Sequence, residues 1–478
     1  MNEVFGAYPT APVALVLSVP MAFALFSALP PYRAAFLTLL VSALLLPVGY
    51  GFQLPGVTEL DKSTLPTLAA ILACVAVRPR EFRYLRLRGW TLTLIAAFAA
   101  GTAMTASTNS DPYAVGGLIL PALSPWDAVV TFRGYAIALI LPFLLGRMLV
   151  REVAQLHRLL YSFVFAFLIY SLPMLWEVRM SPQLHRMVYG YLPSSFVQQI
   201  RGGGFRPIVF VGHGLGLAIL TSFATLASTM LWRRGTKVRG LPPVVTTGYL
   251  AFMVALCKTL SAALYAGLGG LLMFLASAKA QLRAAVVIAC VVLTYPMLRS
   301  FDLFPTSLLT NLSLSASEDR SESLSFRFEN EDQLLEHARQ RLLFGWGGYG
   351  RNRVFSDEGR DVSVTDGLWI IMLGDVGAVG FASMFGLMLL PIFQAGRALR
   401  NLRSPSDQRL LASCGLLIAL NWADSLPNAL SGGVLMLFMT GAFAGVVANY
   451  QKAVVPKREP RKAEVPAAAP YGSLQPLR

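Results

Sequence analysis

Long apolar runs separated by shorter polar connections dominate the pattern of this sequence. Most of these runs have roughly 17 to 25 residues, the length that a helix needs to cross a bilayer. No stretch alternates like a barrel strand, and bundled helices are the other way to satisfy backbone groups in lipid. The pattern predicts about thirteen spanning helices, near residues 10–29, 34–54, 65–78, 89–107, 126–148, 158–176, 207–232, 241–256, 259–278, 284–300, 367–393, 409–424 and 430–449.

The composition supports this interpretation. The chain has 478 residues, of which 55% are hydrophobic and only 14% are charged, whereas a soluble domain has about a quarter charged residues. We therefore expect an all-α polytopic membrane protein with about 12 to 14 transmembrane helices. One large extracytoplasmic loop is expected between the late helices.

The pattern divides the chain into four parts. We expect an N-terminal bundle of about ten helices at 1–300 with an outer loop at 177–206, a large periplasmic loop at 301–366, C-terminal helices at 367–449 and a cytoplasmic tail at 450–478. The tail is rich in Pro, Ala and charge, which predicts disorder. Within the large loop, the near-helical spacing of apolar residues predicts an amphipathic helix along the membrane interface; these residues are Phe328, Leu334, Leu335, Ala338 and Leu342.

The net charge of +15 is explained by topology rather than by a nucleic-acid partner. If the spans alternate, four basic groups fall on one side, which the positive-inside rule assigns to the cytoplasm. By the same count, the N-terminus lies outside. The groups are Arg78, Arg80, Arg83, Arg86 and Arg88; Arg233, Arg234, Lys237 and Arg239; Arg397, Arg400 and Arg403; and the basic residues of the tail.

The first candidate site is IRGGGFRPIVFVGHGLGLAIL, residues 200–220. Pro207 suits the first turn of a helix, and the helix N-terminus with Arg201 and Arg206 would bind an anion. On that helix, His213 would lie about 9 Å further into the apolar region. The alternative is that the arginines anchor the protein at the interface and that His213 bonds a neighbouring helix.

The second candidate is the segment RLLFGWGGYGRNR, in which glycines and aromatics are surrounded by arginines. It lacks the Gly-Lys-Ser/Thr of a phosphate loop and is expected outside the cytoplasm, so a nucleotide site is excluded. We expect Trp346 and Tyr349 to pack on a glycan and Arg339 and Arg341 to bind its charged groups. A loop with interfacial aromatics is the alternative.

Three acidic residues are further candidates. Asp366 precedes the predicted span at 367–393, so it is either a helix N-cap or a catalytic base. Asp375 would lie about 13 Å along that span, where a carboxylate requires a partner; Arg133 and Lys258 are candidates. Asp424 is a third intramembrane acid, and for each a structural ion pair is as reasonable as catalysis.

No motif with metal-ligand spacing and no nucleophile elbow occurs in the chain, so we expect no metal and no cofactor. Arginines would then neutralise a leaving group, and one histidine or carboxylate would act as base. The four cysteines lie in or beside apolar spans and are expected to be packing residues.

At these motifs the chain resembles the bacterial O-antigen polymerase and O-antigen ligase superfamily. The family's arginine–glycine–aromatic entry into a mid-chain span is resembled by IRGGGFRPIVFVGHGLGLA. Its short turn with a basic residue beside Ser is resembled by ALCKTLSAALYAGLGGLL. The end of its large loop is resembled by RLLFGWGGYG. From Asp366 to Gly380, DG-x9-GAVG has the spacing of the ligase motif His-Asn, nine residues, Gly-x-x-Gly. Asp366 stands where the ligases have histidine, which favours a polymerase.

The resemblance implies a metal-independent glycosyl transfer between undecaprenyl-diphosphate-linked glycans at the periplasmic face of the bacterial inner membrane. Arg201, Arg206 and Arg341, with Arg327, would bind the diphosphate, and Asp366 or His213 would act on the acceptor hydroxyl. Membrane lipid, a chain-length regulator and a flippase are the implied partners. A ligase that uses another acceptor, and a polysaccharide flippase or transporter, are the alternatives.

Overall fold

A computed structural model describes residues 6–53, 56, 58–85, 87–201, 203–301, 303–307, 310, 318–429 and 432–451. Within these ranges the chain is mainly helical, with three short antiparallel hairpins. The hairpins are β1 (Gly51–Phe52) with β2 (Leu60–Asp61), β3 (Tyr113–Val115) with β4 (Leu118–Leu120), and β5 (Ile200–Arg201) with β6 (Gly204–Phe205). Almost all of the predicted tail at 450–478 lies outside the described residues.

The chain is a multi-pass membrane protein. In the described part, eight helices are long and apolar enough to cross a bilayer: α1 (Thr10–Ala28), α4 (Trp90–Ser107), the continuous Pro125–Leu149, α7 (Val153–Met180), α9 (Gly214–Arg233), α13 (Ala278–Ser300), α16 (Leu368–Asn401) and α18 (Gly433–Tyr450). Four apolar helices are shorter: α2 (Pro31–Leu45), α3 (Thr64–Val77), α10 (Pro243–Leu256) and Leu260–Leu275. With α17 (Pro405–Asp424), a helix lies at each of the predicted ranges.

Two of these helices contain π-helical turns. Pro125–Leu149 consists of α5 (Pro125–Tyr135), the π turn η2 (Ala136–Ile140) and α6 (Leu141–Leu149). Leu260–Leu275 consists of α11 (Leu260–Leu264), the π turn η4 (Tyr265–Gly269) and α12 (Gly270–Leu275). Such turns occur mostly inside α-helices and often near functional sites. Short helices complete the described fold: η1 (Pro79–Tyr84), α8 (Leu184–Tyr189) and η3 (Val197–Gln199).

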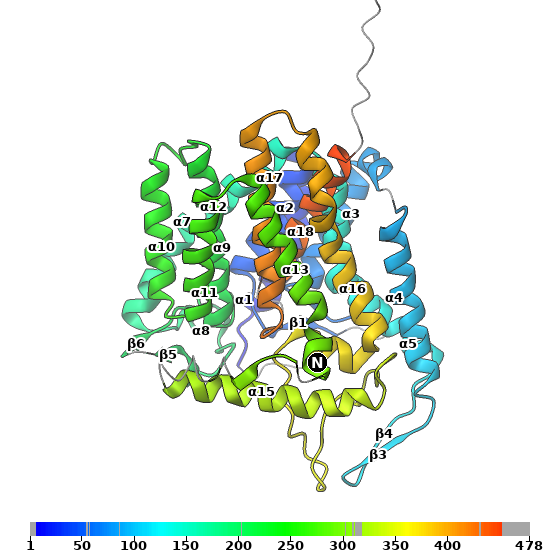
Figure 1. The fold of residues 1–478 in the computed structure, drawn as a ribbon. Coiled ribbons are helices and arrows are strands. Elements are labelled where there is room, and N and C mark those ends of the chain that lie inside the picture. Colours follow the sequence, from blue (N-terminus) through cyan, green and yellow to red (C-terminus); the bar gives the residue numbers. More distant parts are fainter. Residues whose placement is uncertain are drawn as a thin grey trace, which may run out of the picture.

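The helices of the bundle lie side by side, and α15 (Glu318–Arg339) lies across the lower end of the bundle (Figure 1). The hairpins β3–β4 and β5–β6 lie at this same end. Tyr8 also belongs to it, because its backbone N–H donates to the carbonyl of Tyr189 in α8 at 2.9 Å. The fold therefore brings the connecting segments of distant parts of the chain together at one end.

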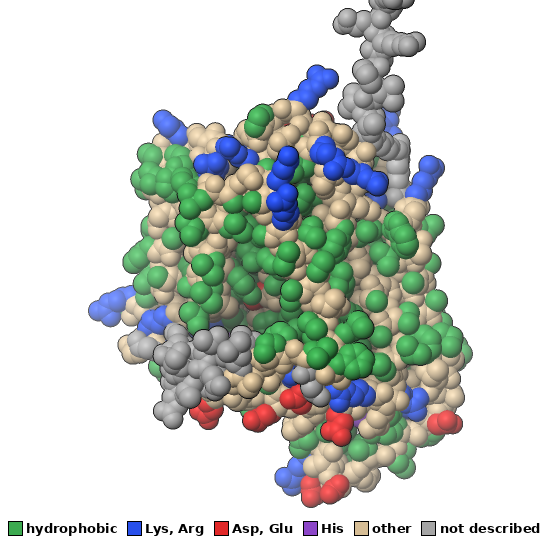
Figure 2. All heavy atoms as spheres, viewed as in Figure 1, with side chains coloured by type: hydrophobic (Ala, Val, Ile, Leu, Met, Phe, Trp, Pro, Cys, Tyr) green, Lys and Arg blue, Asp and Glu red, His purple; other side chains and the backbone are tan. Residues whose placement is uncertain are grey.

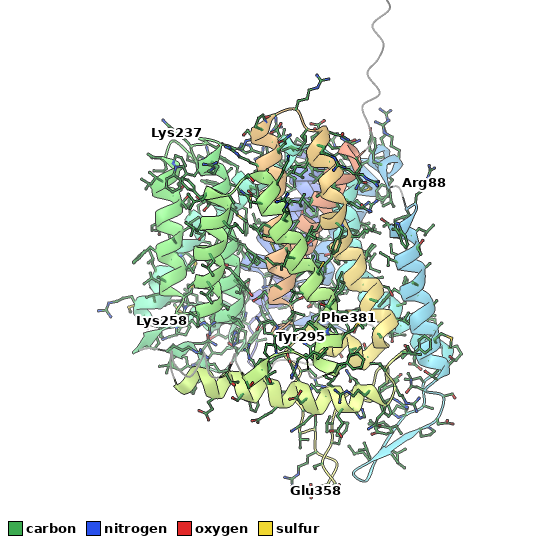
Figure 3. All side chains as sticks on the ribbon, viewed as in Figure 1. Arg88, Lys237, Lys258, Tyr295, Glu358 and Phe381 are labelled. Carbon is green, nitrogen blue, oxygen red and sulfur yellow. The ribbon has the colours of Figure 1, made fainter. Side chains whose placement is uncertain are left out.

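The two ends of the molecule differ in charge. Lys and Arg gather at the upper end in Figure 2, and the acidic side chains seen in this view lie at the lower end, around α15, together with further Lys and Arg. Figure 3 places Arg88 and Lys237 at the upper end, and Lys258 and Glu358 at the lower end. This arrangement agrees with the predicted grouping of the basic loops on one side of the membrane.

Glycines allow close helix contacts inside the bundle. α6 packs along α18, and a Cβ at Gly441 would collide with the carbonyl of Phe143, as would a Cβ at Gly146 with that of Phe438. Small residues at such contacts let backbones approach, which is how membrane helices gain packing energy.

A polar network holds α15 under α13 and α16. Arg299 of α13 pairs with Glu331 at 3.5 Å and with Asp332 at 2.7 Å. Tyr295 and Trp369 donate to the Glu331 carboxylate at 3.1 and 3.4 Å. Burial raises the pKa of Glu331, and Arg299 lowers it.

The predicted amphipathic helix is present as α15, but its C-terminal limit was wrong. Leu334, Leu335 and Ala338 are buried as expected, whereas the helix ends at Arg339 and Leu342 is 40% exposed. The chain turns there because the following backbone bonds to α16.

α16 is a broken helix. Gly377 has φ 68° and ψ −172°, which interrupts the helix within its first turns. The break is filled by the loop segment 342–347, whose backbone pairs with residues 374–379 through four hydrogen bonds of 2.8 to 3.2 Å. Side chains would prevent this approach: a Cβ at Gly345 would lie 2.6 Å from the backbone N of Gly377. Broken helices are tolerated at membrane depth only where their backbone groups find partners.

Candidate functional site

Three distant segments converge below α9, at the lower end of the bundle. Electrostatic effects on His213 show the convergence, because Arg206, Arg201 and Arg327 all lower its pKa and Asp366 raises it, after the larger effect of burial. Arg327 and Asp366 also pair directly, with 3.5 Å between Nε and Oδ2. We call Arg201, Arg206 and Arg327 the outer arginine cluster.

Glu177 shapes the segment that carries Arg206. This glutamate lies in the last turns of α7 and is fully buried. Its carboxylate accepts the backbone N–H groups of Ile208 and Val209 at 2.8 and 2.7 Å, and that of Leu184 at 3.0 Å. These bonds hold the segment in a non-helical path, so α9 begins at Gly214. The prediction that Pro207 opens the helix was wrong.

Arg206 is the buried member of the cluster. Its side chain is 3% exposed, and one terminal nitrogen donates to the Thr259 hydroxyl at 2.9 Å. Its Nε has no hydrogen-bond partner among the described residues. It lies against the start of α9, where a Cβ at Gly214 would be 2.6 Å from Arg206 Nε. Burial, followed by Arg201, lowers the pKa of Arg206 to about 10, so it remains charged at neutral pH.

His213 caps α9 instead of lying deep within it. Its Nδ1 accepts the backbone N–H of Leu215 at 3.1 Å, and this leaves Nε2 as the protonated nitrogen, 3.2 Å from Gln198 Oε1. The predicted depth of about 9 Å was therefore wrong, because the helix starts seven residues later than the sequence pattern indicated. The imidazole stays neutral because burial and the nearby arginines lower its pKa.

Lys258 joins the site through the β5–β6 hairpin. Its Nζ donates to the carbonyl of Arg201 at 2.8 Å, and the neighbouring Thr259 accepts from Arg206. The turn between α10 and α11 thus supports both arginines of the hairpin segment. It does not provide the predicted partner for Asp375.

Asp366 is not the N-cap that the sequence suggested. Gly367 occupies the cap position of α16 without a side-chain cap, while the Asp366 carboxylate reaches Arg327 and remains 42% exposed. A partly exposed carboxylate beside an arginine can accept a proton from a hydroxyl or release the arginine to another anion.

The glycine–aromatic segment lies elsewhere and has structural contacts. Trp346 is 4% exposed, its ring stacks on His337 at 4.3 Å and its Nε1 donates to the His337 carbonyl. The prediction of Trp346 as a surface for glycan was wrong, because the ring is buried in the junction with α15. Tyr349 is 57% exposed, and its hydroxyl donates to Asp127 at 2.7 Å.

The arginines of this segment also contact the protein. Arg339 donates to the carbonyl of Ser300 at 2.7 Å. Arg341 donates to the carbonyl of Thr108, and its guanidinium lies 4.7 Å from the ring centre of Trp346. Neither is among the groups that shift the pKa of His213.

Among the described residues, neither of the ion pairs predicted for Asp375 forms. Asp375 accepts from the Tyr135 hydroxyl at 2.8 Å, so neither Arg133 nor Lys258 is its partner. Arg133 instead donates to Thr58 Oγ1 at 3.2 Å and to the carbonyl of Gly56.

Asp424 is 1% exposed and accepts from Asn428 at 3.0 Å and from the Tyr265 side chain. Among the described residues, neutral donors therefore bond to both intramembrane acids, Asp375 and Asp424.

Sequence reasoning missed Glu177, Gln198 and Tyr135. A lone carboxylate in the apolar run MLWEV was a detectable signal for Glu177, because a charge in a spanning helix requires partners. Gln198 and Tyr135 gave no comparable signal, since their contacts depend on how distant segments meet.

The described residues contain no group of three or more His, Cys, Asp or Glu side chains arranged to hold a metal ion. In comparisons with protein-family models and with curated protein sequences, nothing matched this chain.

Proposed function

We propose that this protein is a membrane glycosyltransferase that polymerises lipid-diphosphate-linked oligosaccharides at the end of the bundle that carries α15. The observation behind this proposal is the outer arginine cluster, which meets His213 and Asp366 beside the N-terminus of α9. In a bacterial cell, this end would face the periplasm from the inner membrane, because the basic loops lie at the other end. The lipid carrier would be undecaprenyl diphosphate.

The charge balance of the site favours an anionic ligand. Three arginines and Lys258 gather there, and Asp366 is the acid that pairs with one of them within 4.0 Å among the described residues. The positive end of the α9 dipole adds to the same potential. Arginines suit a diphosphate because the planar guanidinium forms paired hydrogen bonds and keeps its charge. Nε of Arg206, which has no hydrogen-bond partner among the described residues, would bond a phosphate oxygen.

The proposed reaction is a substitution at the anomeric carbon of the donor glycan. An acceptor hydroxyl forms the new glycosidic bond, the bond from the anomeric carbon to the phosphate oxygen breaks, and the lipid diphosphate leaves with the electron pair. The hydroxyl proton passes to a carboxylate. Arg201 and Arg206 stabilise the charge that develops on the diphosphate.

Asp366 is the better base of the two candidates. The Nδ1 lone pair of His213 is occupied by the N–H of Leu215, and its Nε2 carries the proton, so His213 would lose its cap if it accepted a proton. Asp366 is partly exposed, and it can accept a proton once Arg327 exchanges it for a substrate phosphate. We assign His213 a positioning role at the start of α9.

A second candidate, transport of the same lipid-linked glycan, is favoured by the break in α16. Transporters often bind substrates at discontinuous helices. Here, however, the backbone groups at the break bond to segment 342–347, so they are not open to a substrate. This arrangement supports an enzyme more than a transporter.

Reconstitution distinguishes the candidates. Purified protein in proteoliposomes would be given an undecaprenyl-diphosphate-linked repeat, and the products separated by gel. A ladder of repeats is the expected result; one transfer to an added acceptor would indicate a ligase. Movement of lipid-linked glycan across the bilayer without new bonds would overturn the enzyme proposal. Lys237→Gln, at the other end of the bundle, is the control and should give a normal ladder.

A further inference from the structure

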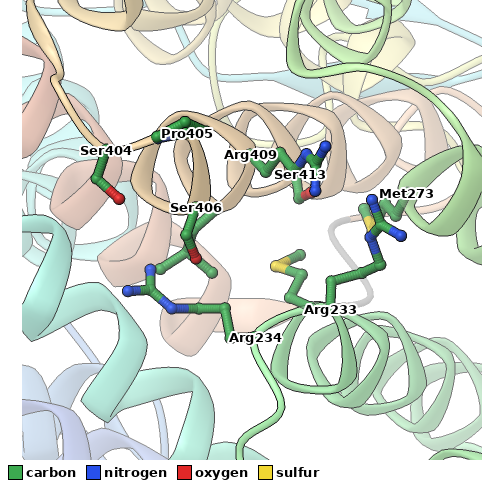
Figure 4. A pocket seen from close by; sticks show the side chains of 10 residues that line it. Arg233, Arg234, Met273, Ser404, Pro405, Ser406, Arg409 and Ser413 are labelled. Atoms are coloured by element: carbon green, nitrogen blue, oxygen red, sulfur yellow. The ribbon is translucent and has the colours of Figure 1, made fainter.

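A pocket of about 360 Å³ opens at the upper end of the bundle, far from the outer arginine cluster. It lies where the ends of α9 and α12 meet the start of α17 (Figure 4). Its walls combine two kinds of residue. Met230, Met273 and Leu410 are buried and apolar, while Arg233, Arg234 and Arg409 carry charge at its edge.

The three arginines differ in their partners. Arg234 pairs with Asp407 at 2.9 Å. Neither Arg233 nor Arg409 has a carboxylate within 4.0 Å among the described residues, and Nε of Arg233 is buried without a hydrogen-bond partner. Figure 4 shows Arg233 and Arg409 extending toward one side of the pocket and Arg234 toward the other. The Arg233 guanidinium also lies 5.3 Å from the ring centre of Phe274, a neutral partner that leaves the charge without a counter-ion. Two cations without a carboxylate partner among the described residues therefore border one cavity.

The start of α17 adds to the positive potential. This helix of 20 residues begins at Pro405, and the side chain of Ser404 caps it by accepting the N–H of Asp407 at 3.4 Å. Its N-terminal dipole points positive charge at the pocket. The hydroxyl of Ser406, which also lines the pocket, is an additional donor for an oxyanion.

Topology alone does not explain this arrangement. Basic residues such as Lys237, Arg397 and Arg400 satisfy the positive-inside rule on the same end and do not line this pocket. At Arg233 and Arg409, by contrast, the charges border a hollow with an apolar floor, which matches a ligand with an anionic group attached to an apolar part.

We propose that this pocket binds a phosphoryl anion, supplied by the headgroup of an anionic phospholipid in the leaflet at the basic end of the protein. The phosphate contacts Arg233 and Arg409, and the apolar portion of the lipid rests on Met230, Met273 and Leu410. A free diphosphate in the adjacent water shares the phosphoryl chemistry and is the other source. The inference is independent of the reaction proposed at the opposite end.

Native mass spectrometry of the full-length protein tests the proposal. The protein is released from nanodiscs that contain phosphatidylglycerol or phosphatidylcholine, and retained lipids are counted. Wild-type protein should retain phosphatidylglycerol selectively. The double variant Arg233→Gln/Arg409→Gln should reduce this retention roughly 30-fold, since each basic residue near a membrane surface contributes about five- to sixfold.

The matched control is Lys237→Gln/Arg397→Gln, which removes the same charge from the same end but not from the pocket. Equal losses in both double variants would overturn the proposal, because they would show a diffuse charge effect. A thermal unfolding curve confirms that each variant is folded, and Ser406→Glu provides a second variant that should expel the anion without removing an arginine. A third outcome is pyrophosphate binding that requires Arg233 and Arg409, without selective retention of phosphatidylglycerol. That result would support a phosphoryl-binding site but overturn the proposal that a lipid supplies the phosphoryl group.

Discussion

Two arginine-rich regions lie at the α15 end of the molecule, and their guanidinium groups have different partners. Arg351, in the glycine–aromatic segment, is 1% exposed and donates to the carbonyls of Asp111 and Pro121 and to the side chain of Asn109. Arg206 is almost equally buried, at 3%, but donates only to Thr259 among the described residues. Nε of both arginines is without a hydrogen-bond partner among the described residues. Arg351 nevertheless makes three bonds that join β3–β4 to the loop, whereas Arg206 makes one and keeps more hydrogen-bonding capacity for a ligand.

This difference teaches that the density of arginines does not identify a site. The segment with Arg339, Arg341 and Arg351 has the more conspicuous sequence, yet carbonyl oxygens of the protein accept from all three side chains. Buried arginines that lack acidic partners and retain free donors are costly in the absence of an anion. That cost is the reason to place the ligand at the outer arginine cluster.

The strongest test of the comparison is Arg206→Ala. We expect a loss of polymer formation of about 100- to 1,000-fold, the usual effect of removing one group that stabilises charge in a transition state. The unfolding temperature should not fall, because the variant removes a buried and poorly paired charge. Product ladders and thermal unfolding of the purified protein measure the two effects. A normal ladder would reject the assignment of the site.

Gly377→Ala tests the structural role of the second region. The positive φ of Gly377 and the contact of its Cβ position with Leu343 should destabilise the protein by about 3 kcal/mol, combining backbone strain and overpacking. Gly396→Ala is the control in the same helix, because a Cβ there meets nothing within 4 Å. Similar unfolding temperatures for both variants would show that the break is unimportant.

Arg351→Met should affect stability and leave activity per folded molecule unchanged. It removes a buried group with three hydrogen bonds, and the carbonyls of Asp111 and Pro121 lose their donor. We expect a cost of about 2 kcal/mol. Activity normalised to folded protein separates this result from that of Arg206→Ala; a large loss of normalised activity would contradict the structural role.

The smallest expected effect concerns pH. Because the folded state lowers the pKa of His213, its contribution to stability is present above the ordinary histidine pKa of about 6.5 and is lost as the pH falls through the lower folded value. Protonation of Nδ1 removes the cap on Leu215, which costs about 1 kcal/mol. In the variant His213→Asn, the asparagine still caps α9 but does not titrate in this pH range. The unfolding temperature of this variant should therefore depend less on pH between 7 and 5.

Hydropathy predicted the helices and the side that carries the basic loops, because both depend on the length and composition of single segments. It also pointed to Arg201, Arg206 and Asp366, since polar groups near an apolar span stand out. The predicted start of α9 was wrong because Glu177, far away in the sequence, accepts hydrogen bonds from the backbone after Pro207.

The role predicted for the glycine–aromatic segment was wrong for a related reason. Its glycines do keep the backbone open for a close approach, but the partner is α16 rather than a ligand. Nothing in the local sequence distinguishes these two partners. Trp346 likewise packs on His337, nine residues earlier in the chain, a contact that only the turn after α15 creates.

The break in α16 also has a consequence for assembly. Until segment 342–347 docks, the interrupted helix exposes backbone groups around Gly377 that lipid cannot satisfy, at several kcal/mol for each group. The membrane bundle and its external loop should therefore fold as one cooperative unit. A chain in which a short linker replaces residues 301–366 should therefore not form a native bundle. It would lose the native position of α16, against which the other segments at that end pack.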